Sequence, residues 1–161
     1  MPMHSRNAPP RETALSCAMT RALAEAAAAA ARGEVPVGAV VLGPDGTVLA
    51  QAGNRTEADC DAAGHAELLA LRAAGRLLGT PRLTGCDLVV TLEPCPMCAA
   101  AAGLFRIRRL IFGAYDPKGG GVDHGPRIFD NSPALHRPEV IGGVREREAA
   151  ALLRAFFAAR R

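Results

Sequence analysis

Hydrophobic positions repeat with the period of an amphipathic helix at both ends of the chain. Leu15, Met19 and Leu23 recur at i, i+4 and i+8, and the alanine-rich stretch that follows has the highest intrinsic helix propensity. This pattern predicts a helix over residues 13–32, which ends at Gly33. Near the C-terminus, helical spacing predicts another helix from about residue 144, carried by Ala149, Leu152, Leu153 and Phe156.

Apolar runs of strand length lie between these helices. Two of them flank the sequence Gly-Pro-Asp-Gly at residues 43–46, which is typical of a β-hairpin turn. A third run, at residues 87–92, is predicted to be a strand covered on both faces. A helix and another strand follow it, and this order predicts that the two strands pair in parallel through a right-handed crossover. The predicted strands are 35–42, 47–54, 87–92, 109–114 and 140–142, and the helices between them are 63–78 and 96–105.

The order of these elements predicts an α/β fold in which helices cover both faces of the sheet. A chain of 161 residues is long enough to form one domain without disulfides. We expect that domain over residues 13–161, after a flexible, polar and proline-rich extension at residues 1–12. The extension lacks the apolar segment of a secretory signal, and no apolar run has membrane-spanning length, so we expect a cytoplasmic protein without membrane contact.

A pair of short motifs indicates the chemistry. Residues 65–67 (His-Ala-Glu) are followed by residues 94–98 (Pro-Cys-Pro-Met-Cys). A structural zinc site closes with four Cys or His ligands, whereas a catalytic site keeps three and leaves one position for water. This pair resembles the H-x-E and P-C-x-x-C signature of the zinc-dependent nucleobase deaminases. We therefore predict that Glu67 moves protons on a water at a zinc ion held by His65, Cys95 and Cys98.

The spacing of the ligands suits one metal ion. The two cysteines lie at i and i+3 where a strand runs into a helix, so both sulfurs can face one point. The N-terminus of that helix favours the thiolate form of cysteine. His65 falls in the first turn of the predicted helix 63–78. If the strands 47–54 and 87–92 are neighbours in the sheet, this helix start lies near the same sheet edge as the cysteines.

Two other kinds of site would use the same cysteines. A redox C-x-x-C pair would leave the histidine and the glutamate of the first motif without a role. A closed structural zinc site needs a fourth ligand, and the candidates, none of which belongs to a second tightly spaced pair, are Cys60, Cys86, His124 and His136. We expect Cys17 and Cys86 to be buried as small apolar side chains, and both candidate histidines to lie in loops or on the surface.

Arginines cluster in two places, although the net charge of +3 is modest. Such clusters can contact the phosphates of a nucleic acid, and they are also common on an ordinary solvated surface. The charge pattern alone therefore leaves both interpretations open. The clusters are Arg106, Arg108 and Arg109 in the middle of the chain, and Arg154, Arg160 and Arg161 at its end.

With these residues in view, the chain resembles the bacterial tRNA-specific adenosine deaminases over residues 15–161. The resemblance implies a cytidine-deaminase-like fold, a three-layer α/β/α sandwich with a central mixed five-stranded sheet. It also implies a homodimer with one Zn²⁺ per subunit, which converts adenosine to inosine at the wobble position of a tRNA anticodon stem-loop. Besides the two motifs, the matching stretches are 34–40, 53–55, 90–95, 112–114 with Asp116 and Lys118, and 156–157 with the terminal arginines.

The same resemblance implies roles for residues outside the metal site. Asn54 would hydrogen-bond the purine, and the Ala66 backbone would contact it. Val35 and Leu92 would line the pocket, and Asp116 would contact the neighbouring nucleotide. A base splayed out of an anticodon loop suits such a pocket, because sequence-specific RNA recognition uses unstacked single-stranded bases. The RNA backbone would be contacted by Lys118, Arg160 and Arg161.

Alternative interpretations are open at this point. Asn54 and Asp116 are also residue types that form turns. Pro96 is more typical of guanine deaminases, so a deaminase of a free nucleobase or nucleoside, of the guanine or cytosine type, is the alternative function. A zinc-stabilised RNA-binding module without turnover is a third candidate, and it requires a fourth protein ligand. The sequence assigns no role to Cys60, Tyr115 or the glycine-rich segment 119–132.

Overall fold

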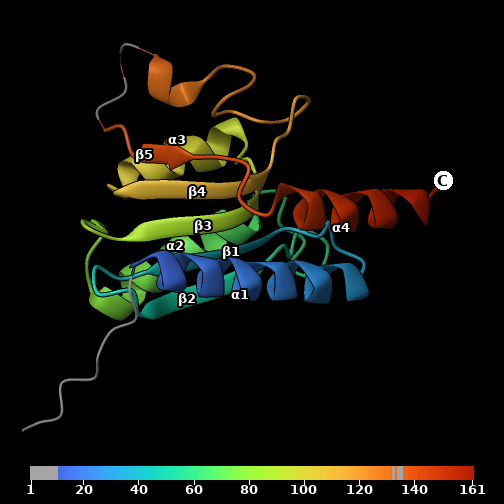
Figure 1. Ribbon diagram of the computed structural model, residues 1–161, viewed down its shortest axis with the longest axis horizontal. Helices are drawn as coiled ribbons and strands as arrows, with labels where there is room; N and C mark the ends of the chain where they lie inside the picture. The colour runs from blue at the N-terminus through green and yellow to red at the C-terminus, as the bar shows by residue number, and fades with distance from the viewer. Residues whose placement is uncertain (1–10, 132, 134–135) are drawn as a thin grey trace, which may run out of the picture.

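Figure 1 shows the computed structural model of the chain, which describes residues 11–131, 133 and 136–161. Most of the predicted extension at residues 1–12 lies outside the described residues. Its last two positions begin the helix α1 (Arg11–Ala31), which therefore starts earlier than predicted. Among the described residues, no helix has both the length and the apolar character needed to cross a membrane.

A mixed sheet forms the middle layer of the molecule. Its strands are β1 (Gly38–Leu42), β2 (Val48–Gly53), β3 (Asp87–Leu92), β4 (Arg109–Ala114) and β5 (Glu139–Ile141). They lie in the order β2-β1-β3-β4-β5. β1 runs antiparallel to β2 and β3, whereas β4 pairs in parallel with β3 and β5. The predicted hairpin, the predicted parallel pair and the predicted five-stranded mixed sheet are confirmed.

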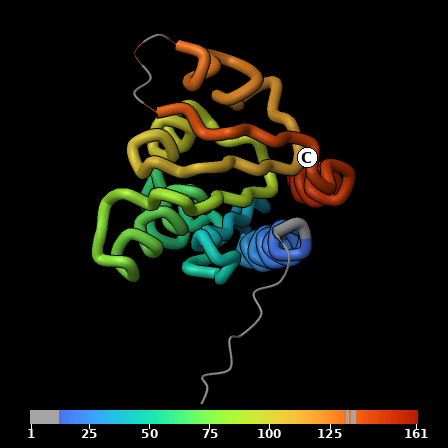
Figure 2. Tube along the Cα trace, turned by 60° about the vertical axis from the view of Figure 1, so that its left-hand side comes forward, coloured from blue at the N-terminus to red at the C-terminus, as the bar shows by residue number. Residues whose placement is uncertain are grey.

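Helices cover both faces of this sheet, as Figures 1 and 2 show. α1 and α4 (Glu146–Ala158) cover one face, and α2 (Ala66–Leu78) and α3 (Pro96–Leu104) cover the other. Successive side chains of β3 point to opposite faces, so Leu88 belongs to the core under α2 and α3, and Val89 belongs to the core under α1. Both side chains are fully buried, which confirms the prediction for this strand.

Small residues let α1 pack close to the sheet. A Cβ atom at Gly38 would collide with the Ala22 carbonyl group, so only glycine fits where β1 passes beneath the helix. The buried stripe of α1 is made largely of Ala14, Ala18, Ala22 and Ala26. Cys17 lies outside this stripe and is exposed, so the prediction that it is buried was wrong. Cys86 is buried, as predicted.

Two predictions at the edge of the sheet that carries the site need correction. β1 begins at Gly38 and not at Val35, because the Val37 N–H donates to the Val35 carbonyl (2.8 Å) in a tight turn through Pro36. β2 and β3 are not neighbours, because β1 lies between them. β1 is antiparallel to both of them, so the C-terminal ends of β2 and β3 still meet at one edge of the sheet.

Asp87 anchors the opposite end of β3. Its carboxylate accepts hydrogen bonds from the guanidinium groups of Arg108 and Arg109, at 2.7 to 3.1 Å. Burial opposes ionisation of Asp87, but the bonds from the two arginines outweigh it and lower its pKa. These arginines of the first sequence cluster therefore have a structural partner.

Candidate metal centre

Two helices begin at residues of the metal motif. His65 is the N-cap of α2, and Cys95 is the N-cap of α3, both with extended backbone conformation. The predicted start of α2 at residue 63 was too early, because the chain before His65 forms a turn in which the Gly64 N–H donates to the Asp61 carbonyl (2.9 Å). Pro96 occupies the first turn of α3, where its fixed φ suits the helix. The positive ends of two helix dipoles thus meet at one place.

The three predicted ligands lie together in the structure. The Nδ1 atom of His65 is 3.5 Å from Sγ of Cys95 and 3.6 Å from Sγ of Cys98. With Zn–S bonds of about 2.3 Å and Zn–N bonds of about 2.0 Å, tetrahedral geometry places adjacent N and S ligands about 3.5 Å apart. The spacing of these side chains therefore fits a zinc ion without rearrangement.

The two sulfurs differ in their affinity for a proton. The interaction between the two neighbouring sulfurs lowers the pKa of Cys95 to about 4 and raises the pKa of Cys98. The hydrogen bond with Cys95 also raises the pKa of His65. A bound cation would replace the proton on Cys98, because metal binding and deprotonation of the ligands are linked.

Glu67 lies beside the ligands in the first turn of α2. The residue is only 4 % exposed. Burial raises the pKa of Glu67 to about 7, against the opposing effects of the Cys98 hydrogen bond and the His65 charge. A carboxyl group in this environment can both accept and return a proton near neutral pH.

The described residues offer no fourth ligand to this cluster, since the only group of three or more candidate ligands among them is His65, Cys95 and Cys98. Cys60 is exposed, and its thiol faces the Glu57 carbonyl. His124 pairs with Glu93 at 2.8 Å, and His136 bonds the Ile107 carbonyl at 2.7 Å. The site therefore has the three-ligand composition of a catalytic zinc centre rather than that of a closed structural one.

Asn54 connects the end of β2 to the start of α2. Its side chain is buried, and its Oδ1 atom accepts a hydrogen bond from the Ala66 N–H at 2.8 Å. Because a backbone N–H can only donate, the amide oxygen must face Ala66, and the amide nitrogen points elsewhere. Val35 and Leu92 are both half-buried against the core at this end of the sheet. The structure therefore brings Asn54 and Ala66 together, and the roles of all four residues toward a purine stay predictions.

The predicted RNA contacts lie on more exposed segments. Asp116 forms a turn, in which its Oδ1 atom accepts from the N–H groups of Lys118 (3.2 Å) and Gly119 (2.9 Å). The Arg160 guanidinium lies 3.4 Å above the Phe156 ring and donates to the Phe156 carbonyl. Lys118 and Arg161 are exposed. The turn explains the position of Asp116, and the RNA contacts stay predictions.

Two buried carboxylates at the site were missed by the sequence interpretation. Glu34 accepts hydrogen bonds from Thr56 and from the N–H groups of Glu57 and Ala58, and so fixes the loop that leads to His65. Glu93, two residues before Cys95, accepts backbone bonds from the segment 116–124. The sequence signal was available at Glu93, a charged residue that directly follows the apolar strand β3, where an unpaired charge would be costly.

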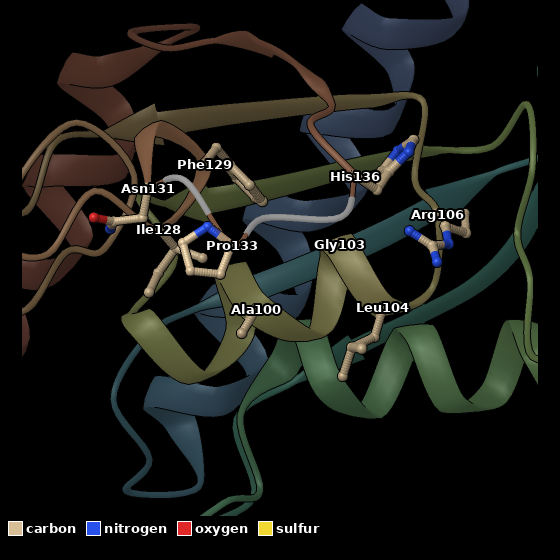
Figure 3. Close-up of a pocket in the computed structure, with 9 residues that line it drawn as sticks. All are labelled: Ala100, Gly103, Leu104, Arg106, Ile128, Phe129, Asn131, Pro133 and His136. Carbon is tan, nitrogen blue, oxygen red and sulfur yellow. The ribbon is translucent and has the colours of Figure 1, made fainter.

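An apolar groove of about 360 Å³ lies away from the metal ligands, on the outer side of α3 (Figure 3). Ala100 and Leu104 of α3 line one wall, and Ile128, Phe129 and Pro133 contribute to the other. None of the predicted metal ligands or substrate contacts lines this groove. It is therefore not the catalytic pocket.

Residues 13–114 match the family model described as the cytidine and deoxycytidylate deaminase zinc-binding region. The chain belongs to this family. The matched region contains all three ligands of the site and Glu67. Zinc is therefore the cofactor, and the chain is a zinc-dependent deaminase, which confirms the catalytic interpretation of the two motifs.

Relatives within the family include proteins that act on RNA and on free bases. The chain is 51 % identical to the tRNA-specific adenosine deaminase of Agrobacterium fabrum, over 89 % of this chain and 93 % of that protein. It resembles a solved tRNA:A34 deaminase with a TM-score of 0.84 and 50 % identity, over 86 % of this chain and 99 % of that one. A solved guanine deaminase from Nitrosomonas europaea is more distant, with a TM-score of 0.77 and 27 % identity, over 88 % and 83 % of the two chains. The predicted cytidine-deaminase-like sandwich is confirmed by the first of these structures.

Proposed function

We propose that this chain converts adenosine to inosine at the wobble position of a tRNA anticodon. The observation that carries the proposal is the three-ligand site with a buried carboxylate beside it. The tRNA substrate is supported by the relatives, since the tRNA-specific enzyme from Agrobacterium fabrum is 51 % identical to this chain and the guanine deaminase is 27 % identical. We place the activity in the cytoplasm, where tRNA is found.

The reaction adds water at C6 of adenine and releases ammonia, which leaves a carbonyl group. A zinc ion held by His65, Cys95 and Cys98 would bind a water and lower its pKa to about 7. Glu67 accepts the water proton and passes it to the ring nitrogen next to C6. It next takes the proton of the new hydroxyl group on C6 and delivers it to the departing amine, so that the carbonyl forms as ammonia leaves. The buried position of Glu67 in the first turn of α2, two residues after His65, keeps its carboxyl group near the metal ligands during both transfers.

Asn54 is the residue that we assign to recognition of the purine. Its oxygen is committed to the Ala66 N–H, which leaves the amide nitrogen to donate to an acceptor nitrogen of the base. The Ala66 backbone then acts by fixing the orientation of Asn54 at the start of α2. Val35 and Leu92, half-buried at the same end of the sheet, complete the apolar walls of the pocket.

The neighbouring nucleotides and the RNA backbone are assigned to the exposed segments around the site. Asp116 contacts the adjoining nucleotide through the carboxylate oxygen that its turn leaves available. Lys118, Arg160 and Arg161 contact phosphates, and this electrostatic contribution weakens as salt rises. The stacking of Arg160 on Phe156 holds its guanidinium in place for such a contact.

A direct test compares an adenosine-bearing anticodon stem-loop with free adenosine, guanine and cytosine. We expect inosine at the wobble position of the stem-loop and no comparable ammonia release from the free compounds. Rapid deamination of guanine with the RNA unchanged would instead support the alternative function, which the likeness to the guanine deaminase and the presence of Pro96 favour. Zinc without any turnover would support the RNA-binding module.

We also infer a homodimer, and the apolar groove on α3 is the face that we assign to it. Leu104 is 72 % exposed and lies among the apolar residues that line this groove, and contiguous exposed apolar surface is typical of an interface. Leu104→Arg is expected to convert the dimer to a monomer, because a buried unpaired charge is costly at an interface. Size-exclusion chromatography with light scattering measures the molar mass of the particle in solution. Leu77→Arg, on α2 and 63 % exposed outside the groove, is the matched control. A parental mass for both variants contradicts the assignment.

A further inference from the structure

The Glu93 carboxylate is a fully enclosed charge. Its side chain is 0 % exposed, and the chain places it between β3 and the metal ligand Cys95. Its Oε2 atom accepts from the N–H groups of Val122 (3.3 Å), Asp123 (3.0 Å) and His124 (3.0 Å). Its Oε1 atom accepts from the Asp116 N–H (3.1 Å) and pairs with Nδ1 of His124 (2.8 Å). One side chain therefore satisfies four backbone donors from both ends of a single loop.

The loop that Glu93 holds, residues 116–124, packs directly on the metal-binding segment. The Gly121 N–H donates to the Pro94 carbonyl at 2.8 Å. A Cβ atom at Gly121 would lie 2.5 Å from the Pro96 nitrogen, so only glycine permits this approach. At Gly120 a Cβ atom would lie 2.5 Å from the Asp116 carbonyl oxygen and 2.6 Å from Cδ of Glu93. The loop has no room to shift toward the site unless Glu93 moves as well.

This loop also carries the residues assigned above to RNA. Asp116 is held by Glu93 through its N–H, and Lys118 follows it in the same turn. Without an internal acceptor, the four N–H groups would have to turn outward to water, because a buried donor left without a partner is costly. The position of Asp116 and Lys118 relative to the metal therefore depends on Glu93.

We propose that Glu93 is a positioning residue for the RNA substrate: it fixes the 116–124 loop against the metal-binding segment so that Asp116 and Lys118 contact the anticodon loop. This inference rests on the proposed function, because the loop is assigned to RNA there. Glu93 does not touch the reacting atoms and acts through the loop. Its loss therefore affects substrate binding more than the chemical step.

Steady-state kinetics on the anticodon stem-loop tests the proposal with Glu93→Gln and Glu93→Ala. Glutamine keeps the size of the side chain but presents an NH₂ group to donors that need an acceptor. We expect KM to rise about tenfold or more for both variants while kcat stays within about threefold, because binding geometry is lost and the chemistry is not. Zinc content should stay at one ion per chain. Hydrogen exchange at the amides of Val122 and Asp123 should become faster.

Two matched variants separate positioning from general destabilisation. Asp87→Asn removes the buried carboxylate at the other end of the same strand, and it should lower the melting temperature with KM unchanged. Gly120→Ala keeps Glu93 but displaces its carboxylate, so it should raise KM as the Glu93 variants do. This variant keeps the test decisive if the Glu93 variants fold poorly.

The outcomes distinguish this inference from the proposed function. A parental KM in folded Glu93 variants, or loss of zinc from them, overturns the positioning role. If the parent chain itself leaves the stem-loop unchanged, the proposed function fails. The exchange of the loop amides then still reports whether Glu93 holds the loop.

Discussion

Glu67→Ala is expected to lower kcat on the anticodon stem-loop by about 10⁴-fold, the upper range for loss of a general acid–base group. The reason is that one carboxyl group makes both proton transfers, and no carboxylate belongs to the group of metal ligands among the described residues. Zinc should stay bound, because all three ligands are intact. Inosine formation and elemental analysis measure the two quantities on the same sample.

Two further variants sharpen this prediction. Glu67→Gln keeps the volume of the side chain but cannot transfer a proton, so it should be as inactive as the alanine variant. Glu148→Ala removes a surface carboxylate of α4 that pairs with Arg145, and it should leave kcat at the parental value. Parental turnover by Glu67→Ala would show that Glu67 is not the proton shuttle.

Cys98→Ala is expected to abolish both zinc binding and activity. Cys98 is fully buried, and its sulfur is one of the three protein ligands found among the described residues, so its loss leaves a two-ligand site with weak affinity. Metal binding stabilises the folded state, so the melting temperature of the variant should also fall below that of the zinc-loaded parent. Elemental analysis, turnover and thermal unfolding check the three consequences.

The matched control is Cys86→Ala, which removes another buried cysteine that lies outside the cluster. This variant should keep one zinc ion per chain and parental turnover, with a modest loss of stability from the small cavity. Full zinc occupancy in Cys98→Ala would mean that Cys98 is not a ligand.

Much of the fold was predictable because its local signals are strong. The helices α1 and α4 and the strands β3 and β4 were found from periodicity and apolar runs, with bounds that differ by only a few residues. The position of β1 between β2 and β3 was not predicted. It depends on pairing between segments that are distant in the sequence, and no local pattern reports this.

The metal centre was predictable for a different reason. Its ligands occur in two short motifs whose spacing reflects the start of a helix, and the structure confirms that they converge. The roles of Glu34 and Glu93 were missed because most of their partners are backbone N–H groups, which every sequence offers. The same limitation applies to Asn54, whose partner is the Ala66 N–H.

The most direct test of the whole account is to sequence tRNA from cells depleted of this chain and to measure inosine at the wobble position. We expect wobble inosine to disappear on depletion, to return with the parent chain, and not to return with Glu67→Ala. Undiminished inosine after depletion, or restoration by Glu67→Ala, would contradict it.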